Sequence, residues 1–407
     1  MAILQKKHRD ALVALVSELA VELHRCGAPA HHLEAAVAEL LAVYGAPGAV
    51  AASPTALWLQ IGARTQVLRL SPGDVDLSRL GRLSALARWR AEVAARGLSA
   101  RRARRKLRRV IRAPGLWSER TQGWAFLLAS ATAGALIGGT LTDAVASGVG
   151  GFVVRQALGV LAARPQWAPL GDGLVALTAG LFGGLCALLG ASPQAVSLST
   201  VIILLPGLSL TVSVTEIAAG QWVAGGTRLL GVFSCLLQLA AGLAAGLHLT
   251  SGVLAAAGPL VQPVALSAGL GVAALIVAPL SFAVLCGCSR RESLAVVLLG
   301  TLGFLVASAV GGLAGTAAGA ALIGLGAGAS ERSGVGLALV VLVPAVLLLV
   351  PGCVGVRGMD LLLGGAVVEG LAVALQALGT ASVIAAAALA AGALLQPAPY
   401  SPSIHAR

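Results

Sequence analysis

Charged residues are scarce in this chain. They make up only 11% of its 407 residues, while hydrophobic residues make up 57% and the mean hydropathy is +0.92. Because soluble domains carry about 25% charged residues, this composition excludes an ordinary soluble protein and indicates a polytopic membrane protein. Aromatic residues account for only 3%, which argues against a large aromatic-lined pocket and favours a small polar ligand.

Motifs of several enzyme and pump classes are also missing. The sequence has no Gly-x-x-x-x-Gly-Lys-Ser/Thr loop, which disfavours an ATP-driven pump. It has no His-Glu-x-x-His helix, and Ser147 and His248 lack a third partner, so we expect no enzyme, no catalytic residue and no cofactor. The six cysteines lack the paired spacing of a zinc or disulfide framework; Cys286-x-Cys288 is a weak redox candidate, and small buried residues are favoured.

Most of the charge lies at the N-terminus. Residues 1–120 hold 20 Lys and Arg against 9 Asp and Glu, and the remainder holds 8 against 7. The start lacks an apolar signal core, which predicts a cytoplasmic N-terminal domain. Periodicity predicts helices over residues 8–25, from residue 32, and over residues 74–96, with a β-hairpin over residues 57–61 and 65–70. We therefore expect a small α+β domain.

Two polar clusters of this domain invite functional readings. Eight of the twelve residues from Arg101 to Arg112 are basic; this juxtamembrane position favours anionic lipid as the partner, with no nucleic acid. His24, His31, His32 and Glu34 are donors that suit a metal. They straddle a Gly-Ala-Pro turn without a completing cluster, so a surface turn is favoured and no metal site is expected.

Ten apolar runs follow, five in each half. The first five cover residues 122–141, 145–161, 174–189, 195–212 and 226–248, and the second five cover residues 264–286, 293–310, 313–328, 335–350 and 364–395. The fold class is thus an all-α membrane protein of about ten transmembrane helices, arranged as two inverted five-helix repeats after the α+β domain. The expected boundaries are residues 1–118, 119–252 and 253–407. Arginines gather in the predicted inner loops and only Arg357 is outside, which supports a cytoplasmic N-terminus.

One pattern occurs in both halves, about 145 residues apart. The first copy has Pro206-Gly207 and then Glu216; the second has Pro351-Gly352 and then Asp360. An apolar helix broken at corresponding positions of two halves is typical of the midplane binding site of a secondary transporter. Odd-numbered halves insert with opposite orientation, which places the first break near the inner ends of the spans and the second near the outer ends.

The few ionisable residues in the apolar halves are the candidates for the transport pathway, because a charge in hydrocarbon costs several kcal/mol without a partner or water. Glu216 follows a run of hydroxyls that includes Thr215, and its carboxylate can take up a proton as desolvation raises its affinity for one. Arg228 can hold a substrate carboxylate or simply balance Glu216. An interfacial turn with a surface salt bridge is the alternative.

The second copy offers Arg357, Asp360 and Glu369. Glu369 is expected to be the deeper acid, a turn or two into the last span, whereas Asp360 can lie exposed in an outer loop. Asp143 and Asp172 fall in predicted connections and are expected to be solvated. The predicted substrate and proton pathway therefore consists of Pro206, Gly207, Thr215, Glu216, Arg228, Pro351, Gly352, Asp360 and Glu369.

These residues carry a family resemblance. The turn of residues 24–29 followed by Glu34, the segment from Leu205 through Glu216 to Leu229, and the late Val350-Pro351-Gly352 resemble the threonine/serine exporter family over essentially the whole chain. The form it resembles is the fused one, with the N-terminal domain and both five-span halves in one polypeptide. The resemblance implies export of L-threonine and L-serine across the inner (cytoplasmic) membrane, driven by the proton motive force, with no partner subunit.

A non-transporting membrane scaffold or sensor that acts through the N-terminal domain is the alternative function. Replacing Glu216 by Gln separates the two, since a scaffold tolerates the change. The exact substrate, the coupling stoichiometry, the role of the N-terminal domain and the oligomeric state, a homo-oligomer included, stay open.

Overall fold

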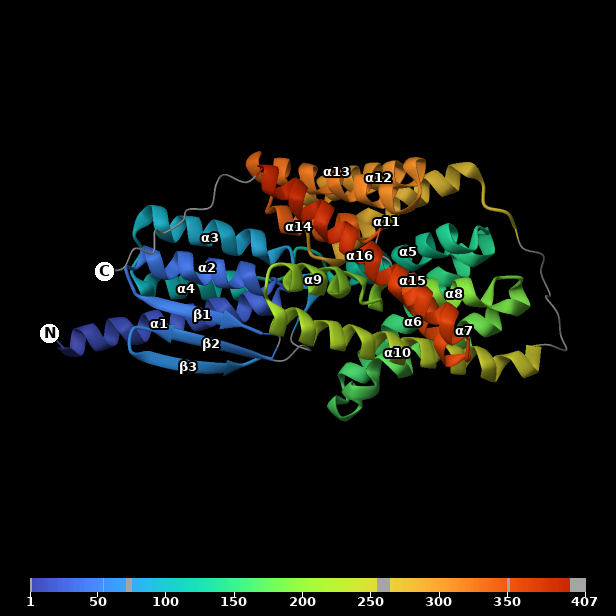
Figure 1. Cartoon of the computed structure of the whole chain (residues 1–407), viewed down its shortest axis with the longest axis horizontal. Helices are drawn as coiled ribbons and strands as arrows, with labels where there is room; N and C mark the ends of the chain where they lie inside the picture. The colour runs from blue at the N-terminus through green and yellow to red at the C-terminus, as the bar shows by residue number, and fades with distance from the viewer. Residues whose placement is uncertain (1, 54, 71–74, 255–263, 350–351, 396–407) are drawn as a thin grey trace.

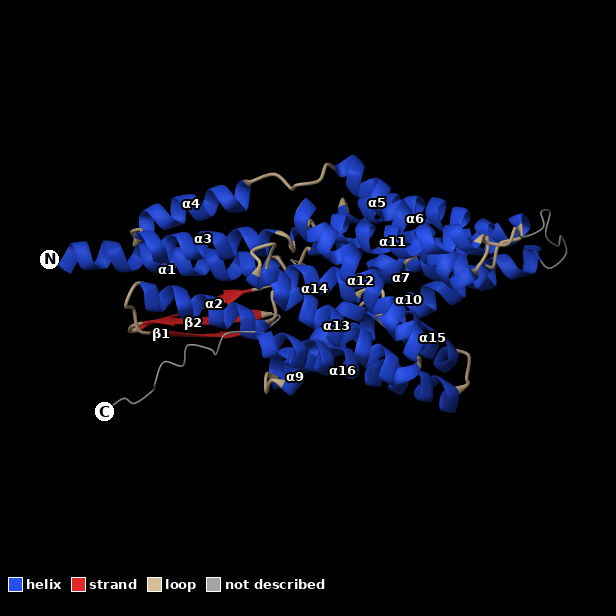
Figure 2. Ribbon diagram, turned by 90° about the horizontal axis from the view of Figure 1, so that it is seen from above, coloured by secondary structure: helices blue, strands red, loops and turns tan. Residues whose placement is uncertain are grey.

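The computed structural model describes residues 2–53, 55–70, 75–254, 264–349 and 352–395. It has two parts, which lie end to end along the long axis of the molecule (Figure 1). We call residues 2–112 the N-terminal domain and residues 119–395 the helical bundle. The chain is mostly helical, and its three described strands form one small sheet in the N-terminal domain (Figure 2).

The N-terminal domain packs helices on an antiparallel sheet. Its elements are α1 (Ala2–Arg25), α2 (Ala30–Val43), β1 (Gly48–Ala52), β2 (Ala56–Ile61), β3 (Arg64–Arg69), the short 3-10 helix η2 (Leu77–Arg79), α3 (Arg82–Arg96) and α4 (Ala100–Arg112). The strand order is β1-β2-β3. Leu57, Leu59 and Ile61 alternate along β2 and are buried in the core with α1 and α2.

Two details of this domain differ from the sequence prediction. The predicted hairpin is β2–β3, but β1 adds a strand that its Gly- and Ala-rich sequence does not indicate. The third helix begins at Arg82 and not near residue 74, because Asp76 caps the separate turn η2 by accepting the backbone N–H of Ser78. The start of the predicted helix, at residue 74, lies outside the described residues.

The basic run forms α4, and part of its charge is neutralised within the domain. Arg104 and Arg108 both pair with Glu18, and Lys106 pairs with Glu92. The hydrogen bonds from the two arginines hold the pKa of the Glu18 carboxyl below its usual range, although burial opposes this. These three basic side chains therefore fix α4 to neighbouring helices of the domain.

The helical bundle has two halves of similar order. The first contains α5 (Glu119–Gly138), α6 (Leu141–Ala162), η3 (Pro165–Leu170), α7 (Gly171–Cys186), η4 (Ala187–Leu189), α8 (Pro193–Thr200), η5 (Ile202–Leu204), α9 (Gly207–Ala218) and α10 (Trp222–Leu254). The second contains α11 (Ala268–Leu285), α12 (Arg290–Val310), α13 (Gly312–Arg332), α14 (Ala338–Val346), α15 (Gly352–Leu363) and α16 (Val367–Leu395).

Seven helices among the described residues are long and apolar enough to span a membrane, or eight if the pair α8 and residues 202–218, bent by 51°, forms one span. The predicted run over residues 195–212 is thus broken into short helices. The run over residues 335–350 yields only the nine-residue α14. The count of ten spans remains a prediction: α14 is short and α5 begins with four polar residues, so neither is among the seven.

Close glycine contacts join α7 to α10, which pack along each other. A Cβ at Gly246 would lie 2.6 Å from both the Leu177 carbonyl oxygen and the Leu181 nitrogen. A Cβ at Gly180 would lie 2.5 Å from the Leu243 carbonyl oxygen. Small residues on both helices thus let the two backbones touch, as in many membrane helix pairs.

We expect Gly246→Ala to destabilise the bundle, because the added methyl group must push α7 and α10 apart. Overpacking of this kind costs about 1–3 kcal/mol in the free energy of unfolding. The midpoint of thermal unfolding in detergent measures the effect. Gly226→Ala in the same helix is the matched control, since no atom lies within 4 Å of its Cβ position and alanine favours helix; equal midpoints for the two variants would contradict the prediction.

Candidate functional site

The first Pro-Gly motif separates two short helices in the bundle. Pro206 has no backbone N–H and drives the preceding residue out of the helical region. Leu205 accordingly has an extended conformation with ψ 124°, and α9 starts afresh at Gly207. Three hydroxyls of α9 donate to carbonyls one turn back, from Thr211 to Gly207, from Ser213 to Ser209 and from Thr215 to Thr211. The Thr215 hydroxyl therefore donates its hydrogen bond within α9.

Glu216 and Arg228 form an ion pair between α9 and α10. The chain reverses after α9 at Gly220, where φ is +80°. Arg228, which lies two turns into α10, therefore returns beside α9. Its Nε donates to Oε2 of Glu216 at 3.0 Å, and its Nη2 donates to Oε1 at 3.1 Å. Gly225 permits this approach, since a Cβ there would lie 2.7 Å from the Ser213 carbonyl oxygen. The two-point geometry is the strong form of an arginine–carboxylate contact.

The Glu216 carboxylate has a third donor, which comes from the N-terminal domain. The backbone N–H of Ala30, the first residue of α2, donates to Oε1 at 3.1 Å. The carboxylate is fully buried, with 0% exposure, while the Arg228 side chain is 21% exposed. The start of a helix attracts negative charge, so α2 and Arg228 stabilise the same anion from opposite parts of the molecule. The alternative of a surface salt bridge does not describe Glu216, because no part of it reaches the surface.

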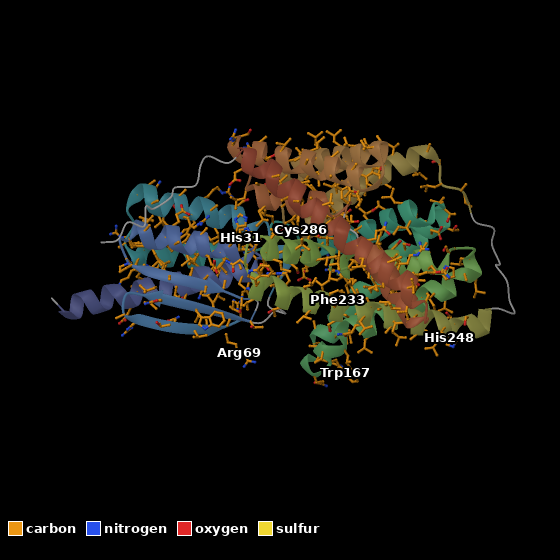
Figure 3. All side chains as sticks on the ribbon, in the orientation of Figure 1. His31, Arg69, Trp167, Phe233, His248 and Cys286 are labelled. Carbon is orange, nitrogen blue, oxygen red and sulfur yellow. The ribbon has the colours of Figure 1, made fainter. Side chains whose placement is uncertain are left out.

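A second contact accompanies the first. Gln221 donates to Oε2 of Glu34 at 3.0 Å, and Oε1 of Glu34 accepts the N–H of Ala52 at 2.8 Å. His31 lies at this junction (Figure 3). Burial lowers the pKa of its imidazole, although the charges of Glu216 and Glu34 raise it in part. A neutral His31 leaves Arg228 as the counter-ion of Glu216.

A cavity of about 600 Å³ lies beside this ion pair. The bundle contributes the broken segment around Pro206, parts of α5, α10 and α11, and the polar side chains of Ser209, Thr227 and Arg228. The N-terminal domain contributes a wall made by His24 and residues 75–78. Arg228 therefore contacts both the buried carboxylate of Glu216 and the cavity. A site of this size, mostly apolar with few polar groups, suits a small molecule.

The second copy of the motif is arranged differently. Pro351 lies outside the described residues; Gly352 opens α15, and Asp360 lies in α15 with its side chain outside the description. Glu369 is exposed and sits in the first turn of α16, which begins at Val367. It thus lies in the first turn of the helix and not one or two turns in, because the helix starts later than the apolar run. The described side chains of this half form no ion pair comparable to that of Glu216 and Arg228.

Two buried acids were misjudged or missed from the sequence. Asp143, predicted to be solvated, is 1% exposed and accepts hydrogen bonds at the start of α6; Glu292 is 2% exposed at the start of α12. Both follow a Thr or Ser by three residues, which is a capping signal readable in the sequence. The Cys286 and Cys288 side chains, once a redox candidate, are 3% and 0% exposed. Burial raises the pKa of the Cys288 thiol, which makes it a poor nucleophile.

Comparison with protein families places this geometry in context. A family model described as "Putative threonine/serine exporter" matches residues 14–250, from α1 to α10. The match includes the N-terminal domain from α1 onward, the broken segment and the Glu216–Arg228 pair, while α11 to α16 lie outside it. No curated protein and no solved structure matches the chain.

Proposed function

The chain belongs to the threonine/serine exporter family, whose model covers more than half of its length, and we propose that it exports small hydroxy amino acids. L-threonine and L-serine are the proposed substrates, the proton motive force is the driving force, and the inner membrane is the location. The observation that carries this proposal is Arg228, which joins a fully buried carboxylate to a cavity of about 600 Å³. Ionisable residues buried in an apolar bundle are candidates for a functional site, and the cavity beside this pair supports a transport pathway.

Two inverted five-helix repeats in one fused polypeptide are part of the proposal. The starts of α9 and α15, at residues 207 and 352, are 145 residues apart, as are the starts of α10 and α16, at residues 222 and 367. Both α9 and α15 have 12 residues. The packing also corresponds, since α7 packs on α10 as α13 packs on α16, and α9 contacts α16 as α15 contacts α10. Such pairs of halves support alternating access.

The N-terminal domain is proposed to lie in the cytoplasm. Arg228 and the Arg290–Arg291 pair lie at the end of the bundle that contacts this domain. An excess of arginine marks the cytoplasmic side of a membrane protein. In α4, Arg109 and Arg112 are exposed and close the end of the helix that leads to the bundle, so we assign the proposed contact with anionic lipid to them.

The proposed mechanism uses one proton on Glu216. In the charged state the carboxylate holds Arg228 through two hydrogen bonds and α2 through a third. Protonation removes the negative charge that attracts all three donors, so the three hydrogen bonds weaken together. Arg228 is then free to bind the carboxylate of an amino acid in the cavity. Once the amino acid is bound, Glu216 releases its proton to the cytoplasm. The substrate then leaves on the outer side, where Glu216 takes up the next proton, so that export is coupled to proton entry.

Efflux from preloaded cells tests this function. Cells with and without the protein are loaded with threonine or serine through dipeptides, and efflux is followed with and without a protonophore. We expect faster efflux from cells that carry the protein, and the protonophore to abolish the difference. Equal efflux from both kinds of cells, with the protein shown to be inserted, would reject these substrates and favour a scaffold or sensor.

A further inference from the structure

Two helices of the bundle begin with similar polar arrangements, in which one carboxylate oxygen of the third helical residue binds back to the capping residue. At the start of α6, the Asp143 N–H donates to the Thr140 hydroxyl at 3.0 Å, and this hydroxyl donates to Oδ2 of Asp143. At the start of α12, the Glu292 N–H donates to the Ser289 hydroxyl at 3.4 Å, and the Ser289 N–H donates to Oε2 of Glu292 at 2.7 Å. In both cases one carboxylate oxygen remains for a partner beyond the helix.

The two starts lie at opposite ends of the bundle. The N-terminal domain touches the turn before α12, where the Gly81 N–H donates to the Cys286 carbonyl at 3.0 Å. Trp117, in the segment that connects the domain to the bundle, donates from Nε1 to the Cys288 carbonyl at 2.8 Å. The start of α6 lies at the other end of α11, where Thr140 pairs with Ala265. One arrangement thus lies beneath the N-terminal domain and the other far from it.

The remaining oxygen is used differently at the two ends. In the far arrangement, Oδ1 of Asp143 directly accepts the N–H of Ser192, the residue that caps α8, at 2.7 Å. In the near arrangement, the corresponding cap of α14 is Leu337, and its N–H does not reach Glu292. It donates at 3.3 Å to the Ser84 hydroxyl, which itself donates to Oε1 of Glu292 at 2.5 Å. Ser84 belongs to α3 of the N-terminal domain.

We propose that Ser84 makes the N-terminal domain the inner gate of the bundle. At the far end, α6 and α8 are joined by a contact that the bundle makes alone. At the near end, α12 and α14 also pack on each other, but the hydrogen bonds that join the cap of α14 to Glu292 of α12 run through the Ser84 hydroxyl. The inner ends of these helices therefore lose this link when the domain lifts, and their packing loosens. The role as a gate rests on the proposed export function, whereas the role in docking does not.

A second contact links the docking of the domain to the ion pair beside the cavity. The Ala30 N–H of the same domain binds Glu216, the partner of Arg228. The domain therefore bridges α9 in the first half of the bundle and α12 with α14 in the second half, and its residues 75–78 form a wall of the cavity between them. When a proton reaches Glu216, the Ala30 contact weakens, and the domain remains attached through the Gln221–Glu34 contact and the surface around Ser84. Two contacts that hold one rigid domain must stabilise each other.

Hydrogen exchange on the full-length protein tests this coupling. In Ser84→Ala the domain loses its bridge, so we expect the amide of Ala30, at the other contact, to exchange about tenfold faster, in line with a lost hydrogen bond and a buried carboxylate and N–H left without a partner. Ser84→Thr keeps the hydroxyl and should restore protection. Amides of β2, inside the N-terminal domain, should be unchanged in both variants. Faster exchange at Gly81 alone, with Ala30 unchanged, would overturn the proposal.

The reciprocal variant is Ala30→Pro. It replaces the N–H that binds Glu216 by the ring Cδ, so that this contact is lost. The backbone accommodates the change, because proline is favoured at the first position of a helix and the preceding residue, Pro29, already has the extended ψ of 151° that a following proline requires. We expect the Gly81 amide to exchange about tenfold faster, whereas Ala30→Gly, which keeps the N–H, should retain protection. Unchanged Gly81 exchange in Ala30→Pro would likewise overturn the coupling.

The role of the domain as a gate is tested by amino acid efflux from cells. With a weakened inner gate, Ser84→Ala should retain amino acid efflux after a protonophore is added, whereas the efflux of the unaltered protein should stop. If Ser84→Ala speeds hydrogen exchange at Ala30 but its efflux still stops with the protonophore, then Ser84 docks the domain and the role as a gate is wrong. If the unaltered protein shows no efflux, the proposed function fails, and the exchange experiments still decide whether the domain docks through Ser84.

Discussion

Glu216→Gln is expected to lower the rate of proton-driven threonine efflux about tenfold to a hundredfold. The amide keeps the size of the side chain and one acceptor oxygen, but it carries no charge and takes up no proton. A hydrogen bond to a charged group is worth about 1.5–3 kcal/mol, and each 1.4 kcal/mol is a factor of ten. The measurement is efflux from dipeptide-loaded cells across a range of imposed pH gradients, and the residual efflux of the variant should no longer follow the gradient.

A purely structural role for Glu216 would also reduce efflux, since breaking a buried ion pair costs about 3–5 kcal/mol when one partner remains. The double variant Glu216→Gln with Arg228→Gln separates the two effects, because it leaves no unpaired charge. We expect the double variant to regain most of the thermal stability lost in Glu216→Gln but none of the gradient-driven efflux. Recovery of gradient-driven efflux together with stability would show that the pair only holds α9 to α10.

Local signals in the sequence account for much of this architecture. Pro206-Gly207 predicts a helix break, and the break is present because Pro206 donates no hydrogen bond and restricts Leu205. Glu216 and Arg228 lie close together because a short turn joins α9 to α10. Their separation of 12 positions along the chain is compatible with such a contact. The β2–β3 hairpin is similarly local, since only residues 62 and 63 separate its strands.

Contacts between distant segments carry no such signal. Ala30 offers only a backbone N–H, which every residue except proline has, and its acceptor Glu216 lies 186 positions away. Ser84 and Glu292 are 208 positions apart, and a single serine in an arginine-rich helix does not point to the bundle. The wall that the N-terminal domain contributes to the cavity depends on such contacts, so the domain was assigned no role from its sequence. The position of Glu369 along its helix differs from the prediction, because residues 364–366 of the apolar run precede the start of α16.

The remaining large effect is expected from Arg228→Lys, which keeps the charge and removes the planar guanidinium. One ammonium group cannot reproduce the paired contacts of Nε and Nη2 with Glu216 and also reach a ligand in the cavity. We expect the intracellular threonine concentration that gives half-maximal efflux to rise about tenfold, since losing one contact to a substrate carboxylate costs at least about 1.4 kcal/mol. Initial efflux rates from cells loaded to graded threonine concentrations measure this.

Thr227→Val is the matched control for this prediction, because Thr227 lines the same cavity and is the neighbour of Arg228. Its hydroxyl donates to the Val223 carbonyl at 2.6 Å within α10, so its loss should leave half-maximal efflux within about twofold. If Arg228→Lys behaves like this control while Glu216→Gln is inactive, Arg228 serves only as a counter-ion and the substrate carboxylate binds elsewhere. A different result is expected if Glu216→Gln loses the response to the proton gradient and Arg228→Lys raises the half-maximal threonine concentration. In that case Glu216 carries the proton, Arg228 binds the amino acid, and the ion pair couples the two.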